Sequence, residues 1–447
     1  MQATANRVTE AYIAECAARG GRLRDVCGEV DVPAAQLKVW RLLPRPLIAE
    51  EAELRAFGSD LARIFRLVTE LPQRCFDGDL ERFCAALRID ERRVRLMRRL
   101  GDTAPPMYGR SDMYHDGTTF RLLEFNIGSA VGSLDVVGTL PRALLRVPAF
   151  AEFATAHGLR FHDTGRDIAE TLRTAGQAVA SGEPVVAILE GPGGMAAYSH
   201  QRRALADQLG GHGLGCRVGE IGDLEFHRGK PRLDGTPIDV ILRYFALEEM
   251  LAHRDGDALL EPVFRAHEEG TVVLWTPMTS NLFGNKGTLA MLSEFAGDGS
   301  VFSAGERAVI DRVLPWSRML GKPGVATDAA LIEDCLERRE QLVLKPTGLF
   351  GGQGVVIGRE TDDHTWRDAV TRGAAAGCLV QQEMRPSIEL MVDPETGECA
   401  GWSTLWGAYL TPAGFAGALA RAVPPGGTTV ISLSANRNTR STCVFMC

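Results

Sequence analysis

The stretch of residues 109–134, GRSDMYHDGTTFRLLEFNIGSAVGSL, constrains the fold more than any other part of the sequence. Two runs typical of extended strands flank the Asp116-Gly117 pair. This pair favours a two-residue type I′ turn, because both central residues of that turn have positive φ. We therefore predict a β-hairpin whose second strand, residues 119–126, ends in Glu124-Phe125-Asn126.

One face of this second strand carries two oxygen-bearing side chains. Residues two apart on a strand share a face, so Glu124 and Asn126 present a carboxylate and an amide oxygen side by side. Mg²⁺ binds one or two such oxygens and completes its shell with water and substrate phosphates. The glycines and serines in residues 128–133 let the backbone approach a ligand closely. An ordinary strand end would look the same, so the metal-site hypothesis depends on the segments that follow.

Composition limits the class of protein. A chain of 447 residues is too long for one hydrophobic core, so we expect about two or three lobes. The content of 45% hydrophobic and 24% charged residues is typical of a soluble globular protein. A net charge of −8 argues against nucleic acid as a partner, and no apolar run is long enough to predict a membrane span.

The first residues and the cysteines bear on localisation. Residues 1–20 lack the basic, apolar and cleavage segments of a secretory signal. The ten cysteines are scattered without a CxxC pair, and Cys443 and Cys447 alone are weak evidence for a zinc site. Reduced thiols account for this pattern more simply, so we expect a cytoplasmic protein.

The middle of the chain predicts a small doubly wound α/β lobe. Residues 184–189 are typical of a buried parallel strand, a helix follows at 198–209, and further strands are expected at 216–218 and 239–244. The turn GPGGMA at 191–196 fits a dinucleotide-binding pattern. Pro192 is unsuited to that pattern, and no acidic residue ends a second strand about 20 residues later, so we interpret it as a strand-to-helix turn.

The most informative loop is LVLKPTGLFGGQGVVIG at residues 342–358, between two predicted strands. It has no Gly-Lys-Ser/Thr sequence opening a helix, so it is not a Walker loop. We predict a glycine-rich hairpin flap whose N–H groups can lie along a triphosphate while Lys345 supplies charge. A flexible hairpin is the alternative. Lys286 lies at the start of another predicted helix, residues 288–294, in the segment that leads into it. A bound anion or simple exposure would account for a lysine there.

Taken in order, these segments resemble the ATP-grasp amide ligases, in the permuted arrangement of eukaryotic glutathione synthetase and its bacterial relatives. Those relatives include glutathionylspermidine-synthetase-like proteins and amino-acid ligases. The resemblance implies an α/β (α+β) ATP-grasp fold in permuted order. It divides the chain into a helical N-terminal region at 1–105, ATP-grasp parts at 106–180 and 271–447, and an inserted doubly wound α/β substrate lobe at 181–270.

The resemblance also implies roles for individual residues, ATP as cosubstrate and two Mg²⁺ ions. Metal binding falls to Glu124 and Asn126. The implied catalytic residues are Arg110, which contacts the acceptor carboxylate, and Arg421, which belongs to a substrate clamp near the C-terminus. The implied ATP-binding residues are Lys286, Lys345, Gly351, Gly352, Gly354, Gln382 and Glu383. The implied substrate-binding residues are Ser129, Gln201, Arg243, Gly426 and Gly427. Expected partners are small amino-acid or peptide substrates, and a homodimer is left open.

Two departures from the family pattern stand out. Glutathione synthetases carry a metal-binding glutamate inside the glycine loop, whereas residues 348–350 here contain no carboxylate, so another residue or water must complete the shell. An ideal two-residue turn would also pair Asp112 with Arg121 and put Arg110 on the face opposite Glu124. A bulge or a longer loop is needed to bring Arg110 and Glu124 to one site.

The implied reaction is the joining of a carboxylate to an amine. ATP phosphorylates the carboxylate, the amine attacks the acyl phosphate, and an amide, ADP and phosphate result. Three arginines, Arg110, Arg243 and Arg421, suit carboxylate-bearing substrates, which favours a dipeptide or γ-glutamyl product with glutamate as one component. The main alternative is a non-catalytic nucleotide- or peptide-binding protein that retains the fold, and a dinucleotide oxidoreductase is a distant third.

Overall fold

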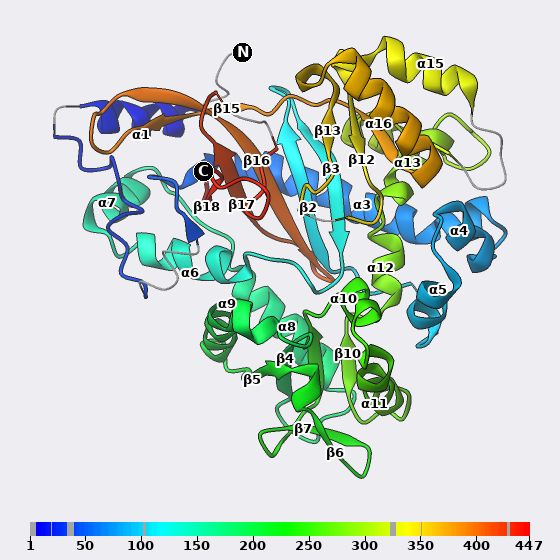
Figure 1. Cartoon of the computed structure of the whole chain (residues 1–447). Helices are drawn as coiled ribbons and strands as arrows, with labels where there is room; N and C mark the ends of the chain where they lie inside the picture. Colours follow the sequence, from blue (N-terminus) through cyan, green and yellow to red (C-terminus); the bar gives the residue numbers. More distant parts are fainter. Residues whose placement is uncertain are drawn as a thin grey trace.

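The computed structural model describes residues 6–18, 20–33, 40–101, 104–321, 328–349, 351–426 and 430–447. Its largest sheet has seven strands in the order β1-β18-β17-β16-β2-β3, with β15 paired to β16 (Figure 1). These strands are β1 (Leu47–Ala49), β2 (Gly109–His115), β3 (Phe120–Ile127), β15 (Ile388–Val392), β16 (Cys399–Thr411), β17 (Gly414–Val423) and β18 (Arg440–Met446). The sheet therefore joins residues 47–127 to residues 388–446.

The hairpin β2–β3 forms, but the predicted two-residue type I′ turn is wrong. His115 pairs with Phe120, so the loop comprises residues 116–119, and within it only Gly117 has a positive φ, of 98°. The cause is Asp116, whose carboxylate accepts hydrogen bonds from Thr118 N and Thr119 N, both at 2.9 Å. These bonds stabilise a longer loop than the Asp-Gly pair alone predicts.

A β-bulge in β3 then resets the register. Asp112 pairs with Glu124 but Met113 pairs with Leu122, so Leu123 is the extra residue. The pairing also sets Arg110 opposite Asn126. Residues directly opposite each other on antiparallel strands share a face. The bulge therefore places Arg110 and Asp112 on the face that carries Glu124 and Asn126.

The opposite face of the sheet is covered by the long helix α3 (Glu51–Cys75) (Figure 1). Its apolar side chains recur at helical spacing and are buried. Phe57 packs on Phe120 with ring centroids 5.4 Å apart, and Phe65 packs on Phe125 at 6.2 Å. The other N-terminal helices are α1 (Arg7–Ala17), α4 (Leu80–Ala86) and α5 (Glu91–Arg98). The region is not purely helical, since β1 pairs in parallel with β18.

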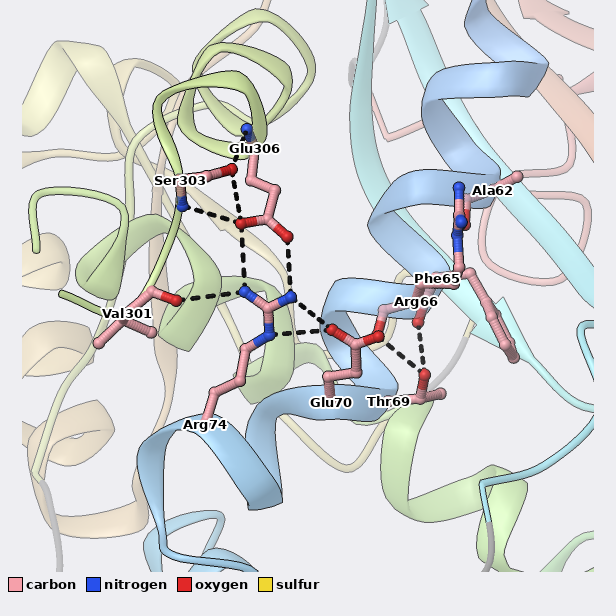
Figure 2. A network of polar contacts seen from close by, with 9 residues as sticks. All are labelled: Ala62, Phe65, Arg66, Thr69, Glu70, Arg74, Val301, Ser303 and Glu306. Atoms are coloured by element: carbon pink, nitrogen blue, oxygen red, sulfur yellow. Dashed lines mark hydrogen bonds and ion pairs between the residues drawn. The ribbon is translucent and has the colours of Figure 1, made fainter. Parts of the chain in front are cut away.

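An ion-pair network fixes the end of α3 to α14 (Ala304–Val313) (Figure 2). Arg74 donates from Nη2 to Glu70 at 2.6 Å and to Glu306 at 2.8 Å, and from Nη1 to the carbonyl of Val301 at 3.2 Å. Ser303 caps α14 and exchanges hydrogen bonds with Glu306, so the carboxylate is held from two sides. The N-terminal region is thereby joined to the segment that precedes the third sheet.

The α/β lobe lies at the bottom of Figure 1 and contains a parallel sheet in the order β10-β9-β4-β5. Its strands are β4 (Val185–Glu190), β5 (Gly215–Glu220), β9 (Val240–Arg243) and β10 (Val273–Trp275). Its helices are α8 (Thr164–Gly176), α9 (Gly194–Gly210), α10 (Leu247–Ala252) and α11 (Gly256–Glu268). A small antiparallel sheet, β6 (Glu225–His227), β7 (Lys230–Leu233) and β8 (Thr236–Pro237), is appended to it. Both α8 and β10 lie outside the expected boundaries of 181–270.

A third sheet, antiparallel in the order β11-β14-β12-β13, carries the glycine-rich flap between β12 and β13. Its strands are β11 (Ser317–Met319), β12 (Leu342–Lys345), β13 (Val356–Ile357) and β14 (Leu379–Gln382). The helices of this part are α13 (Lys286–Phe295), α15 (Ala329–Glu337) and α16 (Asp363–Ala376). The remaining helices are α6 (Leu134–Leu144), α7 (Pro148–Ala156) and α12 (Thr279–Phe283). Within the described ranges, we find no helix with the length and apolar character that crossing a bilayer requires.

Candidate functional site

A cavity of 160 Å³ lies between the large sheet and the flap-bearing sheet. It brings together residues that are more than 200 positions apart in sequence. Of the predicted site residues, it is lined by Arg110, Glu124, Asn126, Lys286, Lys345, Gly351, Gly352, Gln382, Glu383 and Arg421. The predicted metal, phosphate and hinge groups therefore share one cavity, which we call the first cavity.

One side of the first cavity is a row of charged side chains on the large sheet. Arg110 Nε donates to Asp112 Oδ1 at 2.9 Å and its Nη2 donates to Oδ2 at 3.2 Å, while Arg421 Nη2 donates to Oδ1 at 2.7 Å. Burial raises the pKa of Asp112, but the two guanidinium groups outweigh it and hold the pKa below its ordinary value. Asp112 is therefore an anion that orients both arginines. Gly407 leaves room for this arrangement, since a Cβ there would lie 3.2 Å from Arg110 Cδ.

Two lysines lie on the other side of the first cavity. Lys286 Nζ is 3.0 Å from Glu124 Oε1 and donates to the carbonyl of Leu349 in the flap at 2.5 Å. Lys345 Nζ donates to Gln381 Oε1 at 2.6 Å. Burial, with a smaller contribution from Lys286, lowers the pKa of Lys345 to about 8, although Glu124 opposes the shift. Two ammonium groups beside one carboxylate form a site that favours a polyanion.

The flap glycines are required by backbone conformation and by close contact. Gly351 and Gly352 have φ of 66° and 80°, a region that side-chain-bearing residues rarely adopt. A Cβ on Gly351 would lie 2.7 Å from Ser434 Oγ, and one on Gly352 would lie 2.9 Å from Val430 Cγ1. Gly354, also predicted to bind ATP, lies outside the lining of the first cavity. Its role is local, since a Cβ there would meet Pro346 at 2.8 Å.

The donor set of the first cavity fits Mg²⁺ held partly by a nucleotide. Glu124 and Asn126 supply one carboxylate and one amide oxygen on the same face. In the described part of the chain, no group of three histidine, cysteine or acidic side chains is arranged to bind a metal without help. Such a sparse set is typical of Mg²⁺ sites completed by water and phosphate, and untypical of structural zinc.

A second cavity, of 470 Å³, adjoins the first. The two cavities share Arg110, Asn126 and Gly351, so a ligand in one lies next to a ligand in the other. Arg243 and Glu248 line the second cavity at the α/β lobe. Sequence reasoning missed Glu248, because a glutamate in the first turn of a helix is accounted for by the helix dipole.

Arg243 is buried in the wall of the second cavity. Its Nε donates to Thr276 O at 3.1 Å, its Nη1 to Phe245 O at 2.9 Å, and its Nη2 to Asn281 Oδ1 at 3.0 Å. Burial lowers its pKa to about 10, and Glu248 opposes the shift, so the side chain stays charged at neutral pH. The guanidinium is therefore a fixed positive charge at the cavity wall.

Three predicted substrate-binding residues lie outside the linings of both cavities, and a fourth is not among the described residues. Ser129 is fully buried, donates to Arg243 O at 2.7 Å and accepts from Thr276 N at 3.0 Å, so it supports the wall instead of lining it. Gln201, on α9, lines neither of the two cavities, and Gly426 follows β17 outside both linings. Gly427 lies outside the described residues.

The GPGGMA turn is a strand-to-helix connection between β4 and α9, as predicted. Glu220, at the end of β5, accepts hydrogen bonds from Gly193 N at 2.8 Å and Met195 N at 2.9 Å. A carboxylate of the chain itself thus occupies the amides at the start of α9. A dinucleotide pyrophosphate would have to displace it, which argues against the oxidoreductase alternative.

Comparison with solved structures identifies the fold. The structure matches a glutathione synthetase-like effector, GSS30 from Globodera pallida in its apo form, with a TM-score of 0.57 over 91% of this chain and 90% of that chain. The chain has the glutathione synthetase-like ATP-grasp fold. The predicted α/β ATP-grasp architecture is thereby confirmed. Sequence identity to GSS30 is 15%, so this likeness concerns the fold alone.

Two further proteins show limited similarity to this chain. One, named "Putative glutamate--cysteine ligase 2-2" from Frankia casuarinae, is 27% identical over 202 residues. That match spans 44% of this chain and only 21% of the Frankia protein. A "Putative gamma-glutamylcysteine synthetase" from Methylobacillus flagellatus has a TM-score of 0.42, 12% identity, and coverage of 81% and 86%, which supports no inference. No protein-family profile matches the chain.

Proposed function

We propose that this protein is an ATP-dependent carboxylate–amine ligase that joins amino acids through an amide bond, with ADP and phosphate as the other products. The observation that carries the proposal is the first cavity, where two lysines, a carboxylate and an amide oxygen lie beneath a glycine-rich flap. An adjoining cavity with charged walls is suited to a polar substrate. We further propose a dipeptide or γ-glutamyl product, with glutamate as one component.

The residues of the first cavity suit phosphoryl transfer, which depends on positioning and charge neutralisation more than on a protein nucleophile. Lys286 and Lys345 would bind the phosphates, and Glu124 with Asn126 would hold Mg²⁺. The metal would supply additional neutralisation of the charge that develops on the phosphate oxygens. The flap, held to Lys286 through Leu349, would exclude the water that hydrolyses an acyl phosphate.

The position of Arg110 supports the proposal that it binds the reacting carboxylate. It lines both cavities, so a carboxylate near it lies beside the phosphates of the first cavity and the substrate space of the second. Asp112 holds it by two hydrogen bonds, which fixes the guanidinium plane and leaves Nη1 directed at the carbonyl of Gly132 at 3.1 Å. An incoming carboxylate would bind to an arginine that is already oriented.

The second candidate function is nucleotide or peptide binding without catalysis. The missing glutamate of the glycine loop favours it, since residues 348–350 supply no metal ligand. The presence of Glu124, Asn126 and both lysines in one cavity favours a ligase. Incubation with ATP, Mg²⁺ and pairs of amino acids, followed by mass spectrometry, separates the two: a ligase forms a condensed product together with ADP and phosphate.

The nucleotide site itself is tested by calorimetry with ADP and Mg²⁺. Lys345→Met removes a buried positive charge from the first cavity, and charged hydrogen bonds are worth roughly 1.5–3 kcal/mol, so affinity should fall about 10- to 100-fold. Lys230→Met is the matched control, because Lys230 pairs with Asp239 in the α/β lobe and lines neither cavity. If ADP binds with equal affinity to both variants, the first cavity is not the nucleotide site.

A further inference from the structure

Glu248, at the wall of the second cavity, has a carboxylate oxygen without a hydrogen-bond donor. Glu248 is in the first turn of α10 and lines this cavity. Its Oε2 is buried and has no hydrogen-bond partner. Its Oε1 lies 3.7 Å from Arg93 Nε, too far for a hydrogen bond. A buried anionic oxygen that receives no donor is costly, so the arrangement favours a ligand that supplies one.

The same cavity wall contains a positive charge without an anionic partner. Arg243 donates only to carbonyl, hydroxyl and amide oxygens, and no carboxylate of the described residues lies within ion-pairing distance of it. Glu248 is near enough to affect the pKa of Arg243 but makes no contact with it. The two opposite charges therefore line the same cavity and do not form an ion pair with each other.

A ligand that satisfies both groups carries an ammonium and a carboxylate close together. Building on the proposed function, we propose that the second cavity binds an α-amino acid as its zwitterion, with Glu248 accepting from the α-ammonium group and Arg243 attracting the α-carboxylate. Glu248 is then a specificity-determining residue that requires a free amino group. A second carboxylate on the same substrate would extend toward Arg110, at the wall shared with the first cavity.

Two alternative roles for Glu248 fit its surroundings less well. The ion pair between Glu248 and Arg93 accounts for Oε1, but Arg93 also pairs with Asp90 and leaves Oε2 without a donor. A polyamine would satisfy Glu248, yet it would place a further positive charge near the buried Arg243. An amino-acid zwitterion satisfies the carboxylate and the guanidinium together.

The test is direct binding of the twenty standard amino acids to the full chain, followed by the N-acetyl derivative of each one that binds. We expect at least one amino acid to bind and its N-acetyl derivative to bind about 10- to 100-fold more weakly, because acetylation removes the ammonium charge. Glu248→Gln should weaken binding of the amino acid by a similar factor and abolish the preference for the amino acid over its N-acetyl derivative. Glu249→Gln is the matched control, since Glu249 is on the same helix, caps Ala246 N and lines neither cavity.

The outcomes separate this inference from the proposed ligase function. Failure of all twenty amino acids to bind, equal binding of the N-acetyl derivative, or an unchanged amino-acid affinity in Glu248→Gln overturns the zwitterion site. The N-acetyl comparison uses the unmodified protein, so it decides the question even if Glu248→Gln fails to fold. ADP binding measured in the same samples reports on the first cavity independently: its loss contradicts the ligase proposal and leaves the amino-acid result standing.

Discussion

Lys345 connects the acid–base chemistry of the first cavity with the proposed nucleotide binding. Burial lowers its pKa to about 8 from an ordinary value of 10.5, so the folded protein releases this proton more readily than the unfolded chain does. Below about pH 8 the side chain is an ammonium that attracts phosphate; above it, the neutral amine cannot. A bound polyanion favours the charged form and raises the pKa, which makes binding and protonation reciprocal.

We therefore predict that affinity for ADP and Mg²⁺ decreases as the pH rises from 8 to 10. The decrease should approach about tenfold per pH unit once the free lysine is mostly neutral. Calorimetry across this range is the measurement, and a Lys345→Arg variant is the reference, because an arginine keeps its charge. A profile that is flat for the unmodified protein, or equally steep for both proteins, would contradict the prediction.

Glu124 supports a separate prediction about turnover. Glu124→Gln keeps the size of the side chain and removes the charge that pairs with Lys286 and that the proposed Mg²⁺ site requires. We expect the variant to fold and to melt within a few degrees of the unmodified protein, while amide formation falls at least about 100-fold. Circular dichroism measures the melting temperature, and mass spectrometry of the product measures amide formation. Undiminished turnover at low Mg²⁺ would exclude a metal-binding role.

Some site residues could be predicted from sequence because their relation is local. Glu124 and Asn126 share a face wherever the strand forms, since side chains alternate. Asp112 could not be placed, because its position depends on the bulge at Leu123 and on the hydrogen bonds of Asp116. Glu248 could not be found either, because only the folded cavity distinguishes it from other helix-start glutamates.

The junction of α3 and α14 shows how one element is attached to another. Hydrogen bonds from Arg74 and from Ser303 lower the pKa of Glu306 to about 2. Because the folded-state pKa lies below the ordinary value of 4.5, this group stabilises the fold fully above about pH 4.5. The contribution is lost as the pH falls toward 2.

We predict that Arg74→Met reduces the free energy of unfolding by about 1–2 kcal/mol at pH 7, since a partly exposed pair with a capping role is worth more than a typical surface pair. The difference from the unmodified protein should shrink between pH 4.5 and 2. Denaturant titrations at several pH values measure it. Arg82→Met, which breaks the exposed pair with Asp77, is the control and should change little. If Arg74→Met reduces the free energy of unfolding by the same amount at every pH, the loss does not come from the interaction of Arg74 with Glu306.

Elements were predictable where the pattern was long and periodic. The predicted strand at 184–189 forms as β4, and the predicted helix at 198–209 lies within α9. The short strand β1 could not be predicted: its three residues, Leu47–Ala49, precede a strongly amphipathic helix, and its partner β18 lies at the other end of the chain. Pairing between such distant segments is a tertiary effect that no local window contains.

At the scale of the whole molecule, length predicted several lobes, but not how they meet. The first cavity joins β3 to β12 and β14, which are separated by more than 200 residues. The sequence predicted β3 and β12 as strands, whereas their assembly around one cavity followed only from the resemblance to ATP-grasp ligases. The fold comparison confirms that architecture.

The flap is a wall of both cavities, and this has a kinetic consequence. Leu349, Gly351 and Gly352 line the first cavity, while Thr347, Gly348 and Gly351 line the second. A loop movement that frees the spent nucleotide would also admit solvent to the activated substrate next to it. Premature opening would therefore produce futile ATP hydrolysis. The proportion of ATP hydrolysed without product would then report the lifetime of the closed flap relative to amine attack.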